Sequence, residues 1–371
     1  MKDVAFFAIS SKAILTSADA PRPEASLFTP LIEKLIRRED LTSDEASAAM
    51  AEIMAGRAAE AQIAGLLVGL AMKGERPAEI VGLAKAMRAQ ALPLPQSFAD
   101  VFDTCGTGGD RSGTFNISSC AAVVVAACGV RVAKHGNRSV SSLSGSADVF
   151  EALGVEVTAP PAVVARCLDQ ARIGFLFAPT FHPSMRHVAQ TRRSLGVRTA
   201  FNLLGPLTNP ARATRQLVGV PRPEFTELLA RALLMLGSDR AWVVHGADGI
   251  DEMSTTGHTK ISECANGAVK TFYLHPSDVG LSKSSPAALK GGNAVENGRI
   301  IAAVLDGTSG PARDVVVLNA GAALVIAGAA SSVRDGMKMA GAAIDRKDAR
   351  RTLDALVALS RTPMPTRGPS S

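Results

Sequence analysis

Apolar residues recur with helical spacing near both ends of the chain. Between residues 31 and 36 they fall at i, i+1, i+4 and i+5, which puts them on one face of a helix. The run Thr42-Ser43-Asp44-Glu45 has the spacing of a capping box in front of the next apolar stretch. Gly and Pro stops then delimit further helices, expected at residues 46–55, 59–73, 77–90, 294–305, 312–329, 333–343 and 347–359.

In the middle of the chain, short β-rich apolar runs alternate with helical stretches. Strands are expected to end at Phe102 and to occupy residues 130–133, 174–178, 217–220 and 241–244. The helices between them are expected at residues 144–153, 161–171 and 223–236. This alternation predicts a central, mostly parallel sheet flanked by helices. The stiff segment Leu92-Pro93-Leu94-Pro95 connects it to a smaller all-helical domain, so the fold class is α/β with a helical domain.

The charge balance favours a small anionic ligand. Forty Lys and Arg against 34 Asp and Glu give a net charge of +6 over 371 residues, which suits nucleic acid, a membrane surface or an anionic small molecule. One Trp and one Tyr offer few stacking platforms, and the basic residues are scattered. Apolar helical runs are interrupted before the roughly 18 residues that a membrane span needs. We therefore expect neither nucleic acid nor a membrane as a partner.

The cysteines and the terminal segments indicate the cellular compartment. The five cysteines are odd in number and lack CxxC spacing, so we expect reduced thiols, no cysteine metal site and a cytoplasmic protein. A targeting peptide is the alternative for residues 1–20, but the apolar core at 4–9 is short for one. We expect a disordered extension over residues 1–24 and a disordered tail rich in Pro and Ser over residues 361–371.

The stretch from residue 101 to 138 carries the clearest chemical pattern. Residues 103–110 read DTCGTGGD, and glycines in such a loop let backbone N–H groups approach an anion. The polar run 116–119 then opens an apolar helix that Gly129 ends, and a helix N-terminus attracts negative charge. A strand, a glycine loop and a polar helix start together predict a phosphate site.

Two basic residues strengthen that interpretation. Lys134 and Arg138 follow the next strand, which would place two cations beside the same loop. The alternative is a tight turn without a ligand, since the loop matches neither GxxxxGK[ST] nor GxGxxG. The polar helix start and the two cations make a ligand with several phosphates the better hypothesis.

An acidic pair follows a later strand. Asp251 and Glu252 come after the strand at 241–244 through the loop 245–250. Adjacent carboxylates repel each other, so a pair at this place indicates a hard cation such as Mg²⁺. From these residues alone, a solvated pair of loop acids remains open.

Seven motifs occur in order between residues 27 and 359: DTCGTGGD, FNISS, KHGNR, SGSADVFEALG, FAPTFHPSMRHV, RTAFNLLGPLTNP and HGADGIDEMS. Together they resemble the anthranilate phosphoribosyltransferases of tryptophan biosynthesis. The resemblance implies transfer of the 5-phosphoribosyl group from phosphoribosyl pyrophosphate to the amine of anthranilate, with release of pyrophosphate. It also implies a helical domain at 25–96, joined by helices near 184–206, an α/β domain at 97–360, and an active site between them.

The resemblance also implies a homodimer formed through the helical domain. Small residues at positions 64, 65, 69 and 71 permit close helix contact. Such contact would serve either a subunit interface or tight packing within one domain, and both interpretations stay open.

The resemblance assigns the site residues. The residues implied to bind phosphoribosyl pyrophosphate are Gly106, Thr107, Gly108, Gly109, Asp110, Thr114, Asn116, Ile117, Ser118, Ser119, Lys134 and Ser146. The residues implied to bind anthranilate are Gly106, Asn137, His182 and Arg192. Two Mg²⁺ ions are implied, one held by Asp251 and Glu252 and one reached by Ser118 through the phosphates. No catalytic nucleophile is implied.

Several positions at or near the proposed site have alternative interpretations. Arg192 offers a planar fork that suits a carboxylate, but it could instead lie on a solvated helix face, as expected for Arg193. His135 and His182 are either cleft-lining donors or structural histidines. Met185 stands where the family also has larger side chains, so the resemblance does not define the shape of the anthranilate channel there. Ser119 stands where the family often has Thr, which keeps the hydroxyl.

Two other functions compete. Pyrimidine nucleoside phosphorylases share the fold, but the GTGGD and KHGNR motifs and the acidic pair argue against them. Non-catalytic nucleic-acid-binding relatives are expected to lose the glycine loop or the acidic pair, and both are present here.

Overall fold

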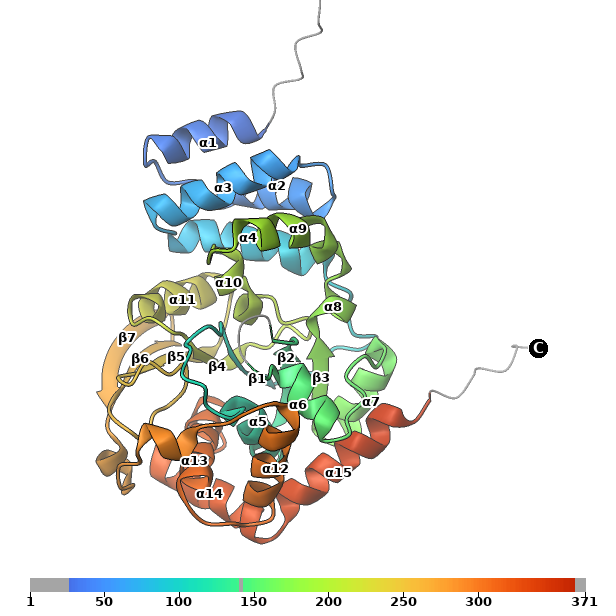
Figure 1. The fold of residues 1–371 in the computed structure, drawn as a ribbon, viewed down its shortest axis with the longest axis vertical. Coiled ribbons are helices and arrows are strands. Elements are labelled where there is room, and N and C mark those ends of the chain that lie inside the picture. Colours follow the sequence, from blue (N-terminus) through green and yellow to red (C-terminus); the bar gives the residue numbers. More distant parts are fainter. Residues whose placement is uncertain (1–26, 140–142, 364–371) are drawn as a thin grey trace, which may run out of the picture.

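The computed structural model describes residues 27–139 and 143–363 and has a helical part above a sheet-containing part (Figure 1). The disorder expected for residues 1–24 lies outside the described residues, as does most of the tail expected from residue 361 onward. In the part of the chain that the structure describes, no helix is both long enough and apolar enough to cross a bilayer.

Four helices form the first part of the chain, as the apolar spacing predicts: α1 (Phe28–Ile36), α2 (Ser43–Met54), α3 (Glu60–Lys73) and α4 (Pro77–Gln90). The predicted capping box at the start of α2 is confirmed, because the Glu45 N–H donates to Thr42 Oγ1 and the Thr42 N–H donates to the Glu45 carboxylate.

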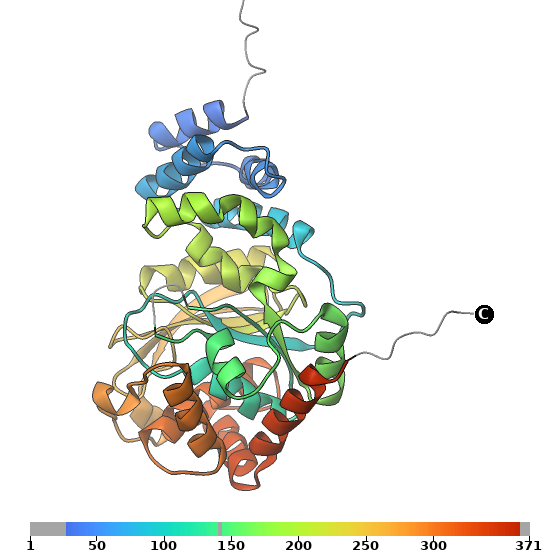
Figure 2. The same ribbon diagram turned by 45° about the vertical axis from the view of Figure 1, so that its right-hand side comes forward.

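Two helices from much later in the chain pack against this first part. They are α9 (Arg186–Leu195) and α10 (Phe201–Leu204), and α9 lies beside the blue helices in both views (Figures 1 and 2). Val188 of α9 and Phe201 and Leu204 of α10 are buried in the same apolar cluster as the cores of α1–α4. The division into domains at 25–96 and 97–360 stays a prediction.

The sheet has seven strands in the order β3-β2-β1-β4-β5-β6-β7. Their bounds are β1 Val101–Gly106, β2 Arg131–Gly136, β3 Ile173–Phe177, β4 Arg215–Gly219, β5 Arg240–Gly246, β6 Thr259–Ala265 and β7 Ala268–Leu274. The first five in spatial order pair in parallel, and β6 and β7 add antiparallel neighbours. The predicted α/β class with a mostly parallel sheet is confirmed.

Helices cover both faces of the sheet (Figure 1). Their bounds are α5 Ile117–Ala127, α6 Ser146–Ala152, α7 Pro161–Gln170, α8 Ala178–Phe181, α11 Glu224–Met235, α12 Ala294–Leu305, α13 Pro311–Ile326, α14 Val333–Asp345 and α15 Asp348–Arg361. Alternation along β5 separates two cores, because Trp242 and Val244 join the cluster that contains α5 and α13, whereas Ala241 and Val243 join the one that contains α11.

The strands differ from the sequence-based expectation in three places. Strand β1 continues past Phe102 to Gly106, because its pairing with β4 extends to Gly219. Strand β2 includes Lys134, which was expected to follow it. The hairpin of β6 and β7 was not predicted, although Asn266-Gly267, with φ of 52° and 74°, is the turn that two-residue hairpins favour.

Candidate active site

A cavity of about 1000 Å³ opens at the carboxyl ends of β1 and β2. It is lined by the glycine loop, the start of α5, the segment after β2, helices α8 to α10 and the acidic pair. Every residue assigned above to phosphoribosyl pyrophosphate, anthranilate or metal lines this cavity. Carboxyl ends of parallel strands meet at one edge of a sheet, which is why motifs so far apart in the sequence converge here.

The glycine loop and the acidic loop approach each other closely. The Thr107 N–H donates to the Gly219 carbonyl at 2.9 Å, which extends the β1–β4 contact beyond the strands. A Cβ on Gly219 would lie 1.5 Å from the Asp251 carbonyl oxygen. Glycine is therefore required at the end of β4 to bring Asp251 beside the loop.

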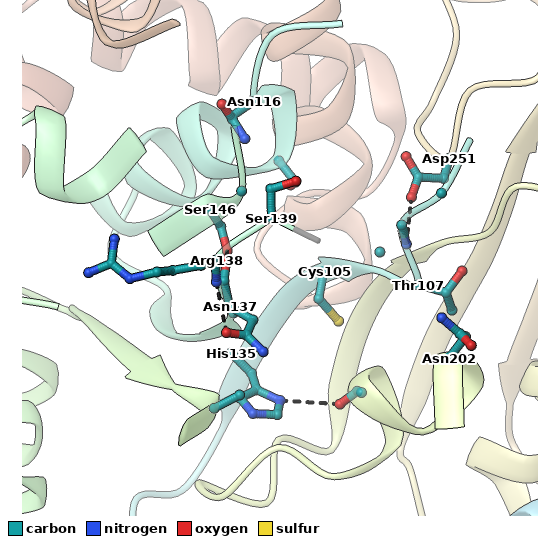
Figure 3. Close-up of a pocket in the computed structure, with 18 of the residues that line it drawn as sticks. Cys105, Thr107, Asn116, His135, Asn137, Arg138, Ser139, Ser146, Asn202 and Asp251 are labelled. Atoms are coloured by element: carbon teal, nitrogen blue, oxygen red, sulfur yellow. Dashed lines mark hydrogen bonds between the residues drawn. The ribbon is translucent and has the colours of Figure 1, made fainter. Parts of the chain in front are cut away.

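The two carboxylates of the acidic pair each accept a backbone N–H. Asp251 Oδ2 accepts from Gly108 at 3.1 Å, drawn in Figure 3, and Glu252 Oε1 accepts from Ser118 at 3.1 Å. Burial, together with the charge of Asp110, raises the pKa of Asp251. Burial, together with the charge of Asp251, raises the pKa of Glu252. Burial and like-charge repulsion thus outweigh the backbone donors at both carboxyl groups, which favours a cation beside them.

The acidic pair fits a magnesium ion that arrives with a phosphate. Among residues 27–139 and 143–363 there is no group of three or more His, Cys, Asp or Glu side chains suited to a metal. Mg²⁺ is usually held by one or two protein carboxylates, with substrate phosphate oxygens and water completing its shell. Two carboxylates facing an anion-binding loop meet that requirement.

Lys134 lies beneath the start of α5. The β1–β2 ladder stops after Phe102, and Lys134 fills the gap with a side chain that is 2% exposed. Its Nζ donates to the Thr104 carbonyl at 2.6 Å and lies 3.4 Å from Ser118 Oγ. A fixed positive charge therefore sits next to the first turn of the helix.

Asp103 holds the other side of the same gap. This buried carboxylate accepts the His135 N–H at 3.2 Å and the Asn209 side-chain amide at 2.8 Å. Asn209 also donates to the Ala133 carbonyl. The two strands are thus kept apart by polar groups that are paired.

Arg138 differs from the expectation that it would stand beside the loop as a second cation. Its guanidinium donates to Glu151 and Asp148 of α6, so two carboxylates already compensate its charge. In Figure 3 it lies across the cavity from Asp251. The electrostatic argument from the sequence therefore applies to Lys134 and not equally to Arg138.

Asn116 precedes α5 but does not cap it through its side chain. Its Oδ1 accepts from Ser144 Oγ at 3.1 Å and from the Asn297 amide at 2.9 Å, and its Nδ2 donates to the Ser144 carbonyl. The side chain thus ties the start of α5 to α12 and to the segment before α6. The polar helix start predicted from the sequence is present, but its amide is engaged by protein groups.

The other end of the cavity contains two histidines and an arginine. The rings of His135 and His182 lie 5.2 Å apart, and burial lowers their pKa values to about 3 and about 4. Both imidazoles are therefore neutral at pH 7, and their buried Nε2 atoms lack a hydrogen-bond partner among the described residues. His135 Nδ1 is 3.1 Å from the Gly205 carbonyl (Figure 3). The Arg192 Cζ lies over the Phe201 ring, 5.2 Å from its centre, in a cation–π contact.

Comparison with known proteins shows the same two-part organisation. Residues 29–91 match the helical bundle domain of a glycosyl transferase family, and residues 99–350 match the a/b domain of that family. The chain is 54% identical to the anthranilate phosphoribosyltransferase of Moorella thermoacetica over 327 residues, which are 88% of this chain and 96% of the relative. The chain belongs to the anthranilate phosphoribosyltransferase family.

Solved structures of anthranilate phosphoribosyltransferases share its fold. The enzyme from Thermus thermophilus matches with a TM-score of 0.85 and 45% identity, over 90% of this chain and 99% of that one. The enzyme from Saccharomyces cerevisiae in complex with PRPP and Mg matches with a TM-score of 0.83 and 26% identity, over 91% and 98% of the two chains. This chain is therefore an anthranilate phosphoribosyltransferase homologue over nearly the whole length of its relatives.

Arg198 was not predicted from the sequence as a residue of this cavity. Arg198 is exposed to the cavity, and its Nη1 donates to the Gly108 carbonyl at 2.8 Å. It belongs to the motif RTAFNLLGPLTNP, in which it is the one charged residue, and that was the available signal. Its side chain places a further cation at the end of the cavity that the glycine loop lines.

Proposed function

We propose that this chain transfers the 5-phosphoribosyl group of phosphoribosyl pyrophosphate to the amine of anthranilate, giving N-(5-phosphoribosyl)anthranilate and pyrophosphate. The observation that carries the proposal is a single cavity with two unlike ends. An anion-binding loop faces two carboxylates at one end, and neutral histidines and an arginine occupy the other. Relatives solved with PRPP and Mg and with 4-fluoroanthranilate support it.

The phosphate end would bind the phosphoribosyl pyrophosphate. The proposed ligands are Gly106, Thr107, Gly108, Gly109, Asp110, Thr114, Asn116, Ile117, Ser118, Ser119, Lys134 and Ser146, all of which line the cavity. The helix dipole at the start of α5 favours negative charge there. The N–H groups of Thr107, Gly108 and Ser118 already donate to Gly219, Asp251 and Glu252, so phosphate donors would come from the other groups of the loop and helix start. Asn116 would act through its backbone, because its side-chain amide is engaged with Ser144 and Asn297. We add Arg198, whose exposed guanidinium lies beside the loop.

Asp251 and Glu252 would hold Mg²⁺ against the diphosphate, and Ser118 would reach a second ion through the phosphates. When bound, the metal neutralises charge on the leaving group. Ser118 suits this place because its N–H already contacts Glu252 and its hydroxyl lies next to Lys134. The backbone donors of Gly108 and Ser118 keep both carboxylates turned toward the loop.

The proposed reaction is displacement at ribose C1. The C1–oxygen bond to pyrophosphate breaks, the amine nitrogen of anthranilate bonds to C1, and that nitrogen then releases a proton to solvent. Charge builds on the departing oxygen, and the sugar gains oxocarbenium character. Fixed positive charge at the leaving group, from Lys134 and Arg198, lowers this barrier because it needs no reorganisation during the reaction. The aromatic amine is already a free base at neutral pH, so no base is needed before its attack, and we assign no nucleophile among the protein's own side chains.

The other end would bind anthranilate through Asn137, His182 and Arg192, with Gly106 between the two substrates. Arg192 can offer two parallel donors to the carboxylate, and its stacking on Phe201 reduces the ordering cost of binding. His182 forms part of the wall at this end, and its Nε2 is buried.

We also propose a homodimer through the helical part. Ile36 at the end of α1 is 75% exposed and Met72 near the end of α3 is 73% exposed. The small residues of α3 serve packing within the chain, since a Cβ on Gly65 would meet Ile32 and one on Gly69 would meet Leu35, each at 3.0 Å. The exposed Ile36 and Met72 therefore support the interface, and Ile36→Glu with Met72→Glu should shift the mass measured by light scattering from dimer to monomer.

Thermal stabilisation tests the proposed function against its competitors. Phosphoribosyl pyrophosphate with Mg²⁺ should raise the melting temperature, because a ligand that binds only the folded state stabilises it. Single-stranded DNA should leave it unchanged, and a pyrimidine nucleoside with phosphate should give no turnover. Stabilisation by DNA, or phosphorolysis of the nucleoside, would favour one of the two alternative functions instead.

A further inference from the structure

A buried asparagine in helix α13 forms hydrogen bonds with the backbone of the residue that directly follows the acidic pair. Asn319 is 0% exposed and lies in a helix whose other inward-facing residues are apolar. Its Oδ1 accepts the Met253 N–H at 3.0 Å, and its Nδ2 donates to the Met253 carbonyl at 3.0 Å. The same Nδ2 donates to the Val315 carbonyl at 2.8 Å, one helical turn earlier. One side chain thus binds both backbone groups of Met253 and is itself fixed by its own helix.

These two hydrogen bonds control the orientation of the acidic pair. The Met253 N–H belongs to the peptide plane that starts at Glu252, so fixing this plane restricts the backbone from which the Glu252 side chain extends. Asp251 and Glu252 carry like charges on adjacent residues, and their repulsion would be relieved if the loop turned one of them away. The buried Met253 side chain anchors the loop in the core but does not set the angle of the peptide.

A buried side-chain amide needs a reason to be retained in an apolar helix. Burying an amide is unfavourable unless its donors and acceptor are paired. Here the side-chain carbonyl and amide of Asn319 both bond to Met253, a loop residue 66 positions earlier in the chain. That geometry reproduces the paired contact of a β-ladder at a place where no strand continues.

We propose that Asn319 is a positioning residue for the metal-binding acidic pair: it does not touch substrate or metal but holds Asp251 and Glu252 facing the glycine loop. This role rests on the proposed function, in which these two carboxylates hold Mg²⁺. Partners one step removed from a metal typically change its affinity by about 10- to 100-fold when they are replaced.

The test compares two Asn319 variants with a matched control. Asn319→Leu nearly keeps the side-chain volume and removes the hydrogen bonds to Met253. Asn319→Ser has a smaller side chain, whose hydroxyl can still donate a hydrogen bond to a carbonyl of its own helix. The control is Thr226→Val on α11, because Thr226 is also a 0% exposed polar residue of a helix, and its hydroxyl donates to the carbonyl of Pro223, at the start of the same helix, at 2.9 Å. The measurement is the Mg²⁺ concentration that gives half of the thermal stabilisation by saturating phosphoribosyl pyrophosphate, together with the KM values for Mg²⁺ and anthranilate.

The Asn319 variants should raise the Mg²⁺ midpoint about tenfold or more and leave the KM for anthranilate unchanged. Thr226→Val should lower the melting temperature without moving the Mg²⁺ midpoint. If the Asn319 variants lose melting temperature but keep the parent's Mg²⁺ midpoint, Asn319 is structural only and the inference is overturned. If Asn319→Leu does not fold, the same comparison is decided by Asn319→Ser. A parent enzyme whose stabilisation by phosphoribosyl pyrophosphate needs no Mg²⁺ would overturn the proposed metal site itself, and the role of Asn319 with it.

Discussion

Replacing Gly109 by alanine should damage the phosphate end of the cavity far more than the same change at Gly108. Both glycines have positive φ, 80° at Gly109 and 66° at Gly108, so alanine is strained at either position. A Cβ on Gly108 would meet nothing within 4 Å, whereas a Cβ on Gly109 would lie 1.7 Å from Nη1 of Arg198. The two variants therefore share the backbone strain and differ in the collision with Arg198.

The difference can be estimated from the contacts. Left-handed backbone costs about 1–2 kcal/mol for alanine, and this term is common to both variants. Gly109→Ala additionally breaks the hydrogen bond from Arg198 to the Gly108 carbonyl and moves the guanidinium away from the ligand. Because this guanidinium is exposed, we take about 1–2 kcal/mol for that loss, which corresponds to a factor of about 5–30.

Steady-state kinetics with both substrates varied provides the assay. The kcat/KM for phosphoribosyl pyrophosphate should be about 5- to 30-fold lower in Gly109→Ala than in Gly108→Ala, with the KM for anthranilate similar in both. In an Arg198→Ala background the gap between the two alanine variants should close, since the collision partner is gone. Equal losses in both variants, or a gap that persists without Arg198, would refute the role given to Arg198.

Three further predictions concern the remaining charged groups. Arg192→Ala should raise the KM for anthranilate and hardly alter that for phosphoribosyl pyrophosphate, and equal loss for both substrates would make Arg192 structural. Lys134→Ala should weaken phosphoribosyl pyrophosphate binding by about 1.5–3 kcal/mol in calorimetry; unchanged affinity would contradict a charge-based role. Without Mg²⁺, burial and repulsion raise the pKa of Asp251 to about 7 and that of Glu252 to about 8, so between the unfolded values near 4 and these values the folded state binds more protons than the unfolded one. The free energy of unfolding should therefore fall as pH rises from about 4 to about 8. Asp251→Asn with Glu252→Gln should flatten that part of the plot of melting temperature against pH. An unchanged slope would show that the pKa values of this pair are not raised in the folded protein.

The parts of the site that were predictable from sequence depend on short stretches of chain. Each of three features can be recognised within about ten residues of sequence: the glycine loop, the polar start of α5 and the acidic pair. They depend on local properties, namely positive φ, the helix dipole and adjacent carboxylates. The order of strands and helices was equally local, since it follows from alternating apolar periods. The family resemblance then supplied roles for individual residues that no spacing rule provides.

The parts that were missed depend on partners distant in sequence. Arg198 contacts the loop across 90 positions, Asn297 reaches Asn116 across 181, and Asn319 reaches Met253 across 66. The pairing of Arg138 with α6 and the burial of Lys134 follow from where the sheet places those strands, which the local pattern does not encode. The β6–β7 hairpin is different, because its Asn-Gly turn was visible in the sequence.

The most direct measurement of the central claim is the loss of anthranilate fluorescence on adding the purified protein, Mg²⁺ and phosphoribosyl pyrophosphate, with mass spectrometry of the product. Fluorescence should fall only when all three are present, N-(5-phosphoribosyl)anthranilate should form, and the folded Asp251→Asn, Glu252→Gln variant should need far more Mg²⁺ for the same rate. Folded parent protein that leaves anthranilate unchanged at saturating substrates, or that consumes it equally well without Mg²⁺, would contradict the account.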